Sequence, residues 1–247
     1  MLRSSNKTPP EPPRTGDPVV VAMSGGVDSS VAAALLLEQG YHVQGITMRV
    51  LPVCDDDHDS TVTDARAVAD HLGIPHHVID LHDTFEKNVI QYFVHEYAAG
   101  LTPNPCVRCN RQIKFGVLRE KANNLGAQWI ATGHYVRKAR VHDRWTVRRA
   151  ACRAKDQSYV LAVLTQEQLA SALFPLGDIE SKETARARAR DLGLNVAERE
   201  ESQECCFIPN DDYRAFLASR QIPSRPGPIM STDGRVLGEH TGLPNYT

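Results

Sequence analysis

The sequence predicts an α/β protein: a Rossmann-like parallel sheet with helices on both faces, followed by the start of a smaller second domain. Two observations lead to this prediction. Short β-branched runs alternate with helix-forming stretches along the first half of the chain, and this alternation is typical of β-α-β units that form a parallel sheet. A turn rich in glycine and serine, SGGVDSS, directly follows the first β-branched run. Ligands of such sheets bind beyond the carboxyl ends of the strands, so this turn lies where a binding site is expected.

The predicted strands are short and apolar, and they cover Pro18–Met23, Tyr41–Val50, Ile74–Leu81 and Ala127–Tyr135. Helix-forming stretches lie between them, from the SGGVDSS turn to Gln39 and over Thr63–Leu72, Phe85–Ala99 and Ile113–Leu125. Gly40, Gly73 and Gly126 each directly follow one of these stretches, as glycines commonly do at helix ends. Two loops are expected: an acidic one over Cys54–Ser60, and one that joins two helices and carries Cys106 and Cys109.

Three parts of the chain are predicted to differ in organisation. Residues 1–17 are polar and proline-rich, and we expect a disordered tail there. Residues 18–206 are expected to form the α/β domain, including two further helical segments over Gln157–Gly177 and Ser181–Leu194. From residue 207 the sequence breaks into short pieces punctuated by proline and glycine. We interpret residues 207–247 as the beginning of a second domain that is cut short.

The composition restricts the class of protein. Hydrophobic residues make up 41% of the chain and charged residues 23%, as in an ordinary globular protein. The longest apolar run, Val31–Leu37, is too short to cross a bilayer, and the polar start does not resemble a signal peptide. A cytoplasmic location without a membrane partner is therefore expected. In that compartment the six cysteines are better suited to metal binding or catalysis than to disulfides.

The charge is distributed unevenly along the chain. The formal net charge of −2 gives no overall sign of nucleic-acid binding, yet eight basic residues and a single acidic one, Asp143, lie between Arg137 and Lys155. Such a run is commonly the solvated face of a hairpin, and it is also what binding to a phosphate backbone requires. Composition alone leaves both interpretations open.

SGGVDSS has the chemistry of a phosphate-binding turn, although it lacks the Gly-Lys-Ser/Thr ending of a Walker A loop. Gly25 and Gly26 let the backbone approach a phosphate, and Ser29 and Ser30 open a helix whose N-terminus attracts anions. Asp28 would repel phosphate on its own, so we predict a Mg²⁺ ion between its carboxylate and the phosphates. The alternative is a serine-capped β-α turn that binds no ligand.

SGGVDSS also resembles the PP-loop of N-type ATP pyrophosphatases, which adenylate an oxygen with ATP and release pyrophosphate. Further segments follow it in order: TPNP before a Cys-Asn pair, then IKF, ATGHY, KDQSY, LFPLG and ESQECCFIP. Together they resemble the tRNA-specific 2-thiouridylases, the MnmA/TrmU family, from Pro18 to Thr247. The resemblance implies ATP-dependent 2-thiolation of the wobble uridine of tRNA. ATP activates the C2 oxygen as an adenylate, and a sulfur carried by the protein then displaces AMP.

The resemblance also implies which residues contact the nucleotide and the RNA. The ATP-binding positions correspond to Ala22, Met23, Ser24, Gly25, Gly26, Val27, Asp28, Ser29, Met48 and Gly133. The positions that contact tRNA or its target base correspond to Asn104, Pro105, Cys106, His134, Lys155, Asp156 and Gln157. The last three lie at the end of the basic run, which favours RNA binding by that run. His134 keeps an alternative interpretation as a cap at the end of a strand.

By the same resemblance the catalytic cysteines are Cys109, which precedes an asparagine, and Cys206, which precedes Phe-Ile. In the commonest version of the family the counterpart of Cys206 carries a persulfide, and the counterpart of Cys109 helps release the sulfur through a disulfide. The nucleophile must be a thiolate, and a nearby cation such as Arg108, Arg111 or Lys114 would lower its pKa.

This chain departs from that version because Cys106 stands where many members have aspartate. Three hypotheses are open. Cys106, Cys109 and Cys206 can hold a [4Fe–4S] cluster whose fourth iron binds a sulfur donor. Cys109 and Cys206 can instead act as thiols, with Cys106 as a spectator or resolving thiol. Zinc is the third option, but a structural zinc site needs four ligands, and Cys205 is a poor fourth.

The cofactors and partners implied by the resemblance are ATP, Mg²⁺, tRNA and a sulfur-donor protein or sulfide source. Two other functions stay open. The family continues beyond GEHTGLPNYT into the rest of a central domain and a C-terminal β-barrel, so this chain can be a non-catalytic fragment that binds ATP or tRNA. A synthetase of a small metabolite would share the PP-loop, but it leaves the cysteines and KDQSY unexplained.

Overall fold

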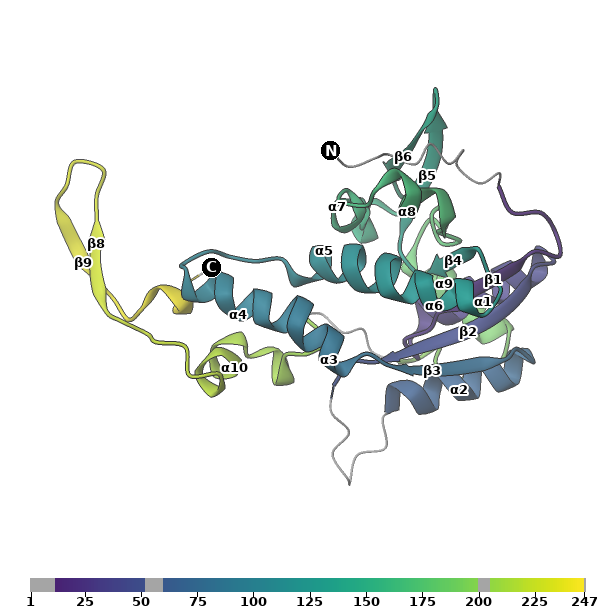
Figure 1. Cartoon of the computed structure of the whole chain (residues 1–247), viewed down its shortest axis with the longest axis horizontal. Coiled ribbons are helices and arrows are strands. Elements are labelled where there is room, and N and C mark those ends of the chain that lie inside the picture. Colours follow the sequence, from purple (N-terminus) through teal and green to yellow (C-terminus); the bar gives the residue numbers. More distant parts are fainter. Residues whose placement is uncertain (1–11, 52–59, 200–204, 247) are drawn as a thin grey trace. The chain divides into compact units, whose positions relative to one another are not determined.

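The computed structural model describes residues 12–51, 60–199 and 205–246 (Figure 1). Its contacts divide the chain into two compact units, Met1–His82 with Asn110–Glu200, and Asp83–Cys109 with Glu201–Thr247. We call them the sheet unit and the cysteine unit and describe each by itself. The predicted acidic loop and most of the predicted tail lie outside the described residues. The predicted boundary after residue 206 stays a prediction, and the contacts group Asp83–Cys109 with the C-terminal residues.

The sheet unit is built on five parallel strands in the order β3-β2-β1-β4-β7. Four of them are the strands that the sequence predicts: β1 (Pro18–Ala22), β2 (His42–Arg49), β3 (His76–Asp80) and β4 (Trp129–Thr132). The fifth, β7 (Ala172–Leu173), lies in a stretch predicted to be helical, and it pairs with β4 through two residues. Two residues are too few to show the alternation of side chains between two faces from which a strand is predicted. The predicted parallel α/β fold is confirmed.

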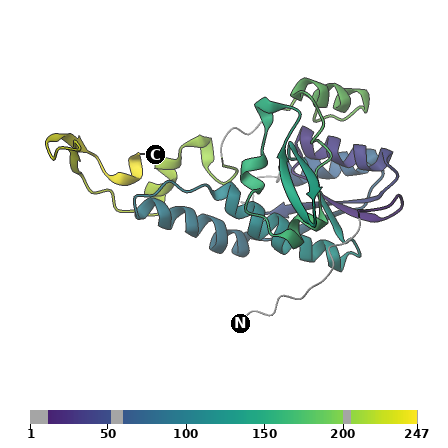
Figure 2. The same cartoon turned by 90° about the horizontal axis from the view of Figure 1, so that it is seen from above.

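Both faces of this sheet are buried under helices (Figure 2). Val19 and Val21 of β1 share the main apolar cluster with α1 (Val27–Glu38), α2 (Ser60–Leu72) and α9 (Lys182–Asp191). Successive side chains of a strand point to opposite faces, so Val20, which is equally buried, points to the second face. The buried residues of η2 (Asn110–Val117) and α6 (Leu118–Asn124) cover that face beside β4.

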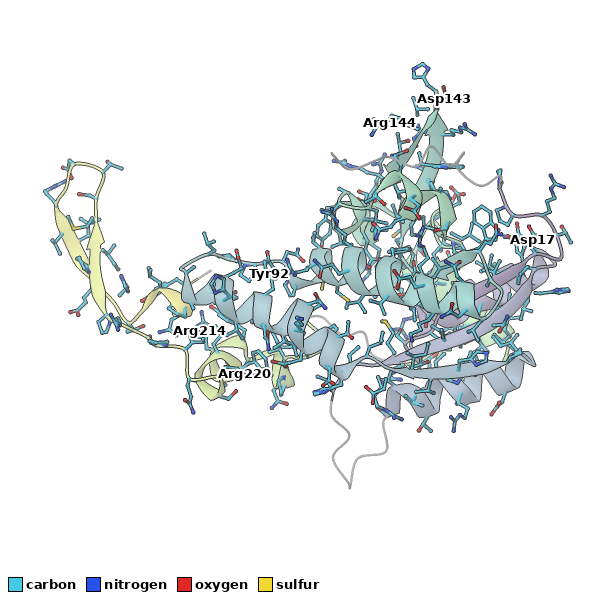
Figure 3. The ribbon with its side chains drawn as sticks, in the orientation of Figure 1. Asp17, Tyr92, Asp143, Arg144, Arg214 and Arg220 are labelled. Carbon is cyan, nitrogen blue, oxygen red and sulfur yellow. The ribbon has the colours of Figure 1, made fainter. Side chains whose placement is uncertain are left out.

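The basic run forms the hairpin that was predicted for it, with antiparallel strands β5 (Val136–Val141) and β6 (Arg144–Arg149). Figure 3 shows Asp143 and Arg144 at its tip. Most of the basic side chains of the run are exposed: Arg140, Arg144, Arg148, Arg149 and Arg153. The hairpin therefore presents a cationic surface.

Lys138 is the exception, because it points into the protein. Its Nζ donates to the carbonyl oxygens of Leu169, Ala170 and Ala172 at 2.9, 3.3 and 2.6 Å, and it lies 4.2 Å from the centre of the Trp145 ring. Burial lowers the pKa of Lys138 to about 8. This lysine anchors the hairpin to the end of α8 (Gln166–Ser171) and does not contribute to the cationic surface.

The cysteine unit is mainly helical and has an aromatic core. It contains η1 (Glu86–Ile90), which follows α3 (His82–Phe85), then α4 (Gln91–Ala98), α5 (Pro105–Cys109), α10 (Tyr213–Ser219) and a hairpin of β8 (Gly227–Met230) and β9 (Val236–His240). Phe207 packs edge-to-face against Phe85 and Phe93, with ring centres 5.8 and 5.3 Å apart. These contacts hold Phe207, the residue after Cys206, against the consecutive helical elements α3, η1 and α4.

Cys106 and Cys109 lie on helix α5, so the prediction that they sit in a loop is wrong. The Oδ1 of Asn104 accepts a hydrogen bond from the backbone N–H of Val107 at 3.2 Å, and Pro105 stands at the first helical position. Asparagine at the cap and proline at the first turn are helix-start signals. The second proline of TPNP therefore begins a helix here.

The remaining short elements are η3 (Arg153–Lys155), α7 (Ser158–Leu161), η4 (Pro209–Asp211) and η5 (Leu243–Asn245). Within the described ranges, no helix combines the length and the apolar character needed to cross a membrane.

Candidate functional site

The predicted phosphate loop lies at the point where the strand order of the sheet reverses. β1 is hydrogen-bonded to β2 on one side and to β4 on the other, and the loop Met23–Gly26 leads from β1 into α1. Ligands bind at this switch point in open parallel sheets. Gly133 follows β4, and Met48 is half-buried near the end of β2, so the sheet brings the three predicted ATP-binding segments to one edge.

Positions 25 and 133 need glycine, because neighbouring segments leave no room for a side chain there. Gly25 has a φ of +66°, and a Cβ there would lie 2.8 Å from the carbonyl oxygen of Thr61. A Cβ on Gly133 would lie 2.6 Å from the carbonyl carbon of Asp28. The backbone after β4 therefore lies against the first turn of α1, and a side chain at either glycine would separate the segments.

Side chains from other elements bind the carbonyl oxygens of the loop. The Thr47 hydroxyl on β2 donates to the carbonyl of Met23 at 2.9 Å. The hydroxyls of Ser29 and Ser30 donate to the carbonyl of Gly26 at 3.1 and 2.9 Å. These carbonyl oxygens already accept hydrogen bonds within the protein, so their negative dipole ends do not oppose a bound anion. The N-terminus of α1 is therefore favourable for an anion.

Asp28 is neutralised by a lysine that the sequence did not indicate. The Nζ of Lys182, at the start of α9, lies 2.8 Å from both carboxylate oxygens of Asp28, and the Tyr135 hydroxyl donates to Oδ1 at 2.8 Å. The Lys182 side chain is 10% exposed and that of Asp28 is 34% exposed. Removing one partner of such a sheltered pair is costly, because the other charge is left uncompensated.

The predicted Mg²⁺ site at Asp28 has to be reconsidered in view of this pair. The prediction rested on a carboxylate that would otherwise repel phosphate, and Lys182 already supplies the opposite charge. The two carboxylate oxygens that would coordinate a cation accept hydrogen bonds from Lys182 and Tyr135. Magnesium at Asp28 stays a prediction.

Arg199 is a second residue at the loop that the sequence did not indicate. Its Nη1 donates to the carbonyl of Gly25 at 2.9 Å and forms an ion pair with Asp64 on α2. The backbone carbonyl of Arg199 accepts from Arg186 at 2.8 Å. Arg199 thus holds the left-handed glycine of the loop from outside the sheet.

We expect Arg199→Gln to weaken ATP binding about 5- to 20-fold, because a hydrogen bond from a charged donor to the loop is lost. Arg199→Lys should recover part of the affinity. Arg190→Gln is the matched control, since Arg190 pairs with Glu198 on the exposed surface, where ion pairs contribute little. Calorimetric titration with ATP measures all three. Equal affinities of wild type and Arg199→Gln would contradict the role assigned to Arg199.

His134 lies inside the protein. It is 8% exposed, and its Nδ1 is 2.7 Å from the Thr132 hydroxyl. Burial, with a smaller effect of Lys114, lowers the pKa of His134 well below its ordinary value, so the ring is neutral at neutral pH. These contacts agree with the interpretation of His134 as a polar group at the end of a strand, and its contact with tRNA stays a prediction.

The other predicted RNA contacts lie next to the hairpin. Asp156 accepts hydrogen bonds from the backbone N–H of Ala150 at 2.7 Å and from the Ser158 hydroxyl at 2.6 Å. Gln157 exchanges hydrogen bonds with the backbone of Tyr135, through its side-chain oxygen at 3.0 Å and its own N–H at 2.9 Å. Both residues shape this turn.

The cysteine unit brings together the two chain segments that carry the predicted catalytic cysteines. A cavity of about 680 Å³ is lined by Pro103 and Pro105 of one segment and by Cys205 and Ile208 of the other. Cys106 and Cys206 are exposed, and Cys109 is partly buried. The two sulfur positions that the resemblance implies therefore belong to one compact unit, although they lie 97 positions apart in the sequence.

Arg108 is committed to contacts within the same unit. Its Nε donates to the carbonyl of Asn88, and its guanidinium lies 4.4 Å from the centre of the Tyr92 ring on α4 (Figure 3). Of the three cations suggested as neighbours of the thiolate, Arg108 thus has its charge directed toward α4. The described residues include no group of three or more His, Cys, Asp or Glu arranged to hold a metal ion. Cys106, Cys109 and Cys206 consequently do not form a ready ligand set for a cluster or zinc, and both stay predictions.

Lys182, Tyr135 and Arg199 could not be found from the sequence. Lys182 looks like the first residue of a helix after the Ser181 cap, whose hydroxyl accepts from the N–H of Thr184. Nothing local indicates that it reaches Asp28, 154 positions earlier. Only the packing of α9 against α1 brings the two together.

Comparison with solved structures gives matches at low sequence identity, of which two are described. One is the U34-tRNA thiolase NcsA from Methanococcus maripaludis with its [4Fe–4S] cluster, with 16% identity, a TM-score of 0.49 and coverage of 83% of this chain and 65% of that chain. The other is a 4-thiouridine synthetase in complex with RNA and ATP, with 16% identity, a TM-score of 0.48 and coverage of 84% and 50%.

Sequence comparison gives much closer relatives. The chain is 51% identical to the tRNA-specific 2-thiouridylase MnmA of Trichlorobacter lovleyi over 230 residues, covering 93% of this chain and 65% of that protein. It is 52% identical to the tRNA-specific 2-thiouridylase MnmA 1 of Caldanaerobacter subterraneus over 242 residues, covering 93% and 66%. The chain thus spans about two thirds of the length of these relatives.

Residues 17–210 match the sequence profile of the tRNA methyl transferase HUP domain. This range contains the five-stranded sheet, the phosphate loop and both predicted catalytic cysteines. The chain therefore belongs to the tRNA methyl transferase HUP domain family and is a relative of the tRNA-specific 2-thiouridylases.

Proposed function

We propose that the chain is the ATP- and sulfur-handling part of a tRNA-uridine 2-sulfurtransferase, which replaces the C2 oxygen of the wobble uridine with sulfur. The observation that carries the proposal is the phosphate loop at the switch point of the sheet, with its carbonyl oxygens bound by Thr47, Ser29, Ser30 and Arg199. Names of relatives at about 50% identity support the same activity. The proposed partners are tRNA and a sulfur-donor protein or sulfide source, in the cytoplasm.

The first proposed step is adenylation. The C2 oxygen of the uridine attacks the α-phosphorus of ATP, and the bond to the leaving pyrophosphate breaks. Negative charge builds up on the phosphates during such a step, and a preorganised loop with donors in place stabilises it. The N-terminus of α1 is oriented for that role, while Lys182 cancels the charge of Asp28. The product of this step is an O-adenylated uridine.

The second proposed step is sulfur transfer by thiols. A persulfide on Cys206 attacks C2 through its outer sulfur, and AMP leaves. The thiolate of Cys109 then attacks the Cys206 sulfur, which releases the thiouridine and leaves a Cys109–Cys206 disulfide for a cellular thiol to reduce. This sequence uses the cysteines of one compact unit, and the exposure of Cys206 suits a residue that must be reloaded by a donor.

Release of pyrophosphate tests the proposal directly. We expect the chain to release pyrophosphate from ATP when an unmodified tRNA with a wobble uridine is present, and to release far less without tRNA. With a sulfur-donor protein that carries a persulfide, and a thiol reductant, also added, 2-thiouridine should appear in the digested tRNA by mass spectrometry. Release that is independent of tRNA would favour a small-metabolite synthetase, and ATP binding without release would favour a non-catalytic fragment.

The cluster hypothesis predicts a separate result for Cys106. If a [4Fe–4S] cluster is bound by Cys106, Cys109 and Cys206, protein purified without oxygen is brown and contains iron and sulfide. Cys106→Ala should then lose the colour, the bound iron and the transfer of sulfur together. An iron-free protein that stays active, with Cys106→Ala equally active, would contradict the cluster and leave the thiol route.

A further inference from the structure

The turn beside the basic hairpin presents an aromatic side chain to solvent. Tyr159 is 63% exposed, more than any other aromatic residue among those that the structure describes. It stands in the first turn of α7, and the next two residues, Val160 and Leu161, are 5% and 0% exposed. The backbone beneath the Tyr159 ring is therefore anchored by buried neighbours.

The polar residues of the same turn are already occupied within the protein. Asp156 binds the N–H of Ala150 and the hydroxyl of Ser158, and Gln157 binds the backbone of Tyr135 on both its side-chain and main-chain sides. These hydrogen bonds hold the turn in one shape. The residue that they leave projecting from it is Tyr159.

The charges around the turn suit a polyanion. Arg148 and Arg149 end β6, Arg153 begins η3, and all three are exposed. Asp156 lies close enough to Arg149 to interact with its charge, but the Asp156 carboxylate is held inside the turn by two hydrogen bonds. Proteins bind single-stranded nucleic acid with exposed rings on surfaces that also carry arginines, because the arginines contact phosphates and a base stacks on the ring.

We propose that Tyr159 is a base-stacking residue that receives an unpaired nucleobase of the tRNA, while the arginines of β6 and η3 bind the adjoining phosphates. This inference rests on the proposed function and adds the residue that recognises a base in this turn. It also divides the roles of KDQSY: Asp156 and Gln157 build the turn, and Tyr159 contacts the RNA. Stacking discriminates an unpaired base from a paired one, since bases inside a duplex do not offer a face.

The test compares Tyr159→Ala, Tyr159→Phe and Tyr159→Trp in the full chain. The probes are an RNA hairpin with an anticodon stem and loop that contains the wobble uridine, and a fully paired RNA duplex. Tyr159→Ala should bind the hairpin about 5- to 100-fold more weakly, the range expected for one stacked base. Tyr159→Phe and Tyr159→Trp should bind it as wild type does, because the ring is kept. Binding of the duplex should not change.

Salt dependence separates the stacking residue from the phosphate contacts. Arg149→Gln should lower the slope of log Kd against log salt by roughly 0.7 to 0.9, the value for one lost phosphate contact. Tyr159→Ala should leave this slope unchanged, because stacking releases no counterions. Unchanged thermal midpoints show that the variants are folded, as expected for an exposed residue.

An unchanged Kd of Tyr159→Ala for the hairpin would contradict the inference while leaving tRNA binding intact. If that variant binds a sulfur-donor protein more weakly instead, the surface belongs to a protein partner and the inference is wrong. If the wild-type chain binds no hairpin at all, the proposed function and the inference are both contradicted. Equal losses for hairpin and duplex would show that Tyr159 does not recognise unpaired bases.

Discussion

Cys206→Ala is expected to abolish the transfer of sulfur to tRNA, by at least about a thousandfold, while pyrophosphate release continues. The reason is that the two chemical steps use different groups: adenylation depends on the phosphate loop, and transfer depends on the nucleophilic sulfur. Cys206 is exposed, so its replacement should cost little stability. The two readouts are 2-thiouridine by mass spectrometry and pyrophosphate by a coupled assay on the same samples.

The neighbouring residue is the matched control for this prediction. Cys205→Ala removes a thiol one position away that lines the cavity of the cysteine unit, and it should transfer sulfur as wild type does. Cys109→Ala should resemble Cys206→Ala in accumulated 2-thiouridine. If Cys205→Ala is inactive and Cys206→Ala is active, Cys205 is the nucleophile and the role assigned to Cys206 is contradicted.

Lys182→Met is the second large effect, and it should lower kcat/KM for ATP on the order of 100-fold. Without Lys182 the carboxylate of Asp28 keeps an uncompensated negative charge in the first turn of α1, where the phosphates have to bind. A charge left without its partner is unfavourable where water screens it only in part, and much of that cost falls on the binding of another anion. The measurement is pyrophosphate release as a function of ATP concentration.

The double variant Asp28→Asn with Lys182→Met decides what the pair does. If Lys182 acts by neutralising Asp28, removing both charges should restore part of the activity lost in Lys182→Met, which is a non-additive result typical of residues in contact. If Asp28 has a duty of its own, such as holding Mg²⁺, the double variant should be as inactive as Lys182→Met. Thermal unfolding of each variant shows whether a loss of activity is a loss of fold.

The sheet and its helices could be predicted because their signals are local. Pro18–Ala22 is a continuous apolar run, and glycines mark the ends of several helices, so four strands follow from the sequence. β7 could not be predicted, because it has two residues and owes its strand character to pairing with β4. The helix α5 was predicted to be a loop, whereas Asn104 and Pro105 start a helix there.

Some parts of the candidate site likewise follow from local sequence patterns, and others do not. The phosphate loop, the basic hairpin and the cysteine segments could be predicted from the sequence, because each is a short pattern whose residues are neighbours in the chain. The packed structure was needed to show that Lys182 and Tyr135 bind Asp28, that Arg199 binds Gly25, and that Lys138 is not part of the cationic surface. Those contacts join residues far apart in sequence, and their energies depend on burial and distance, which exist only once the helices have packed on the sheet.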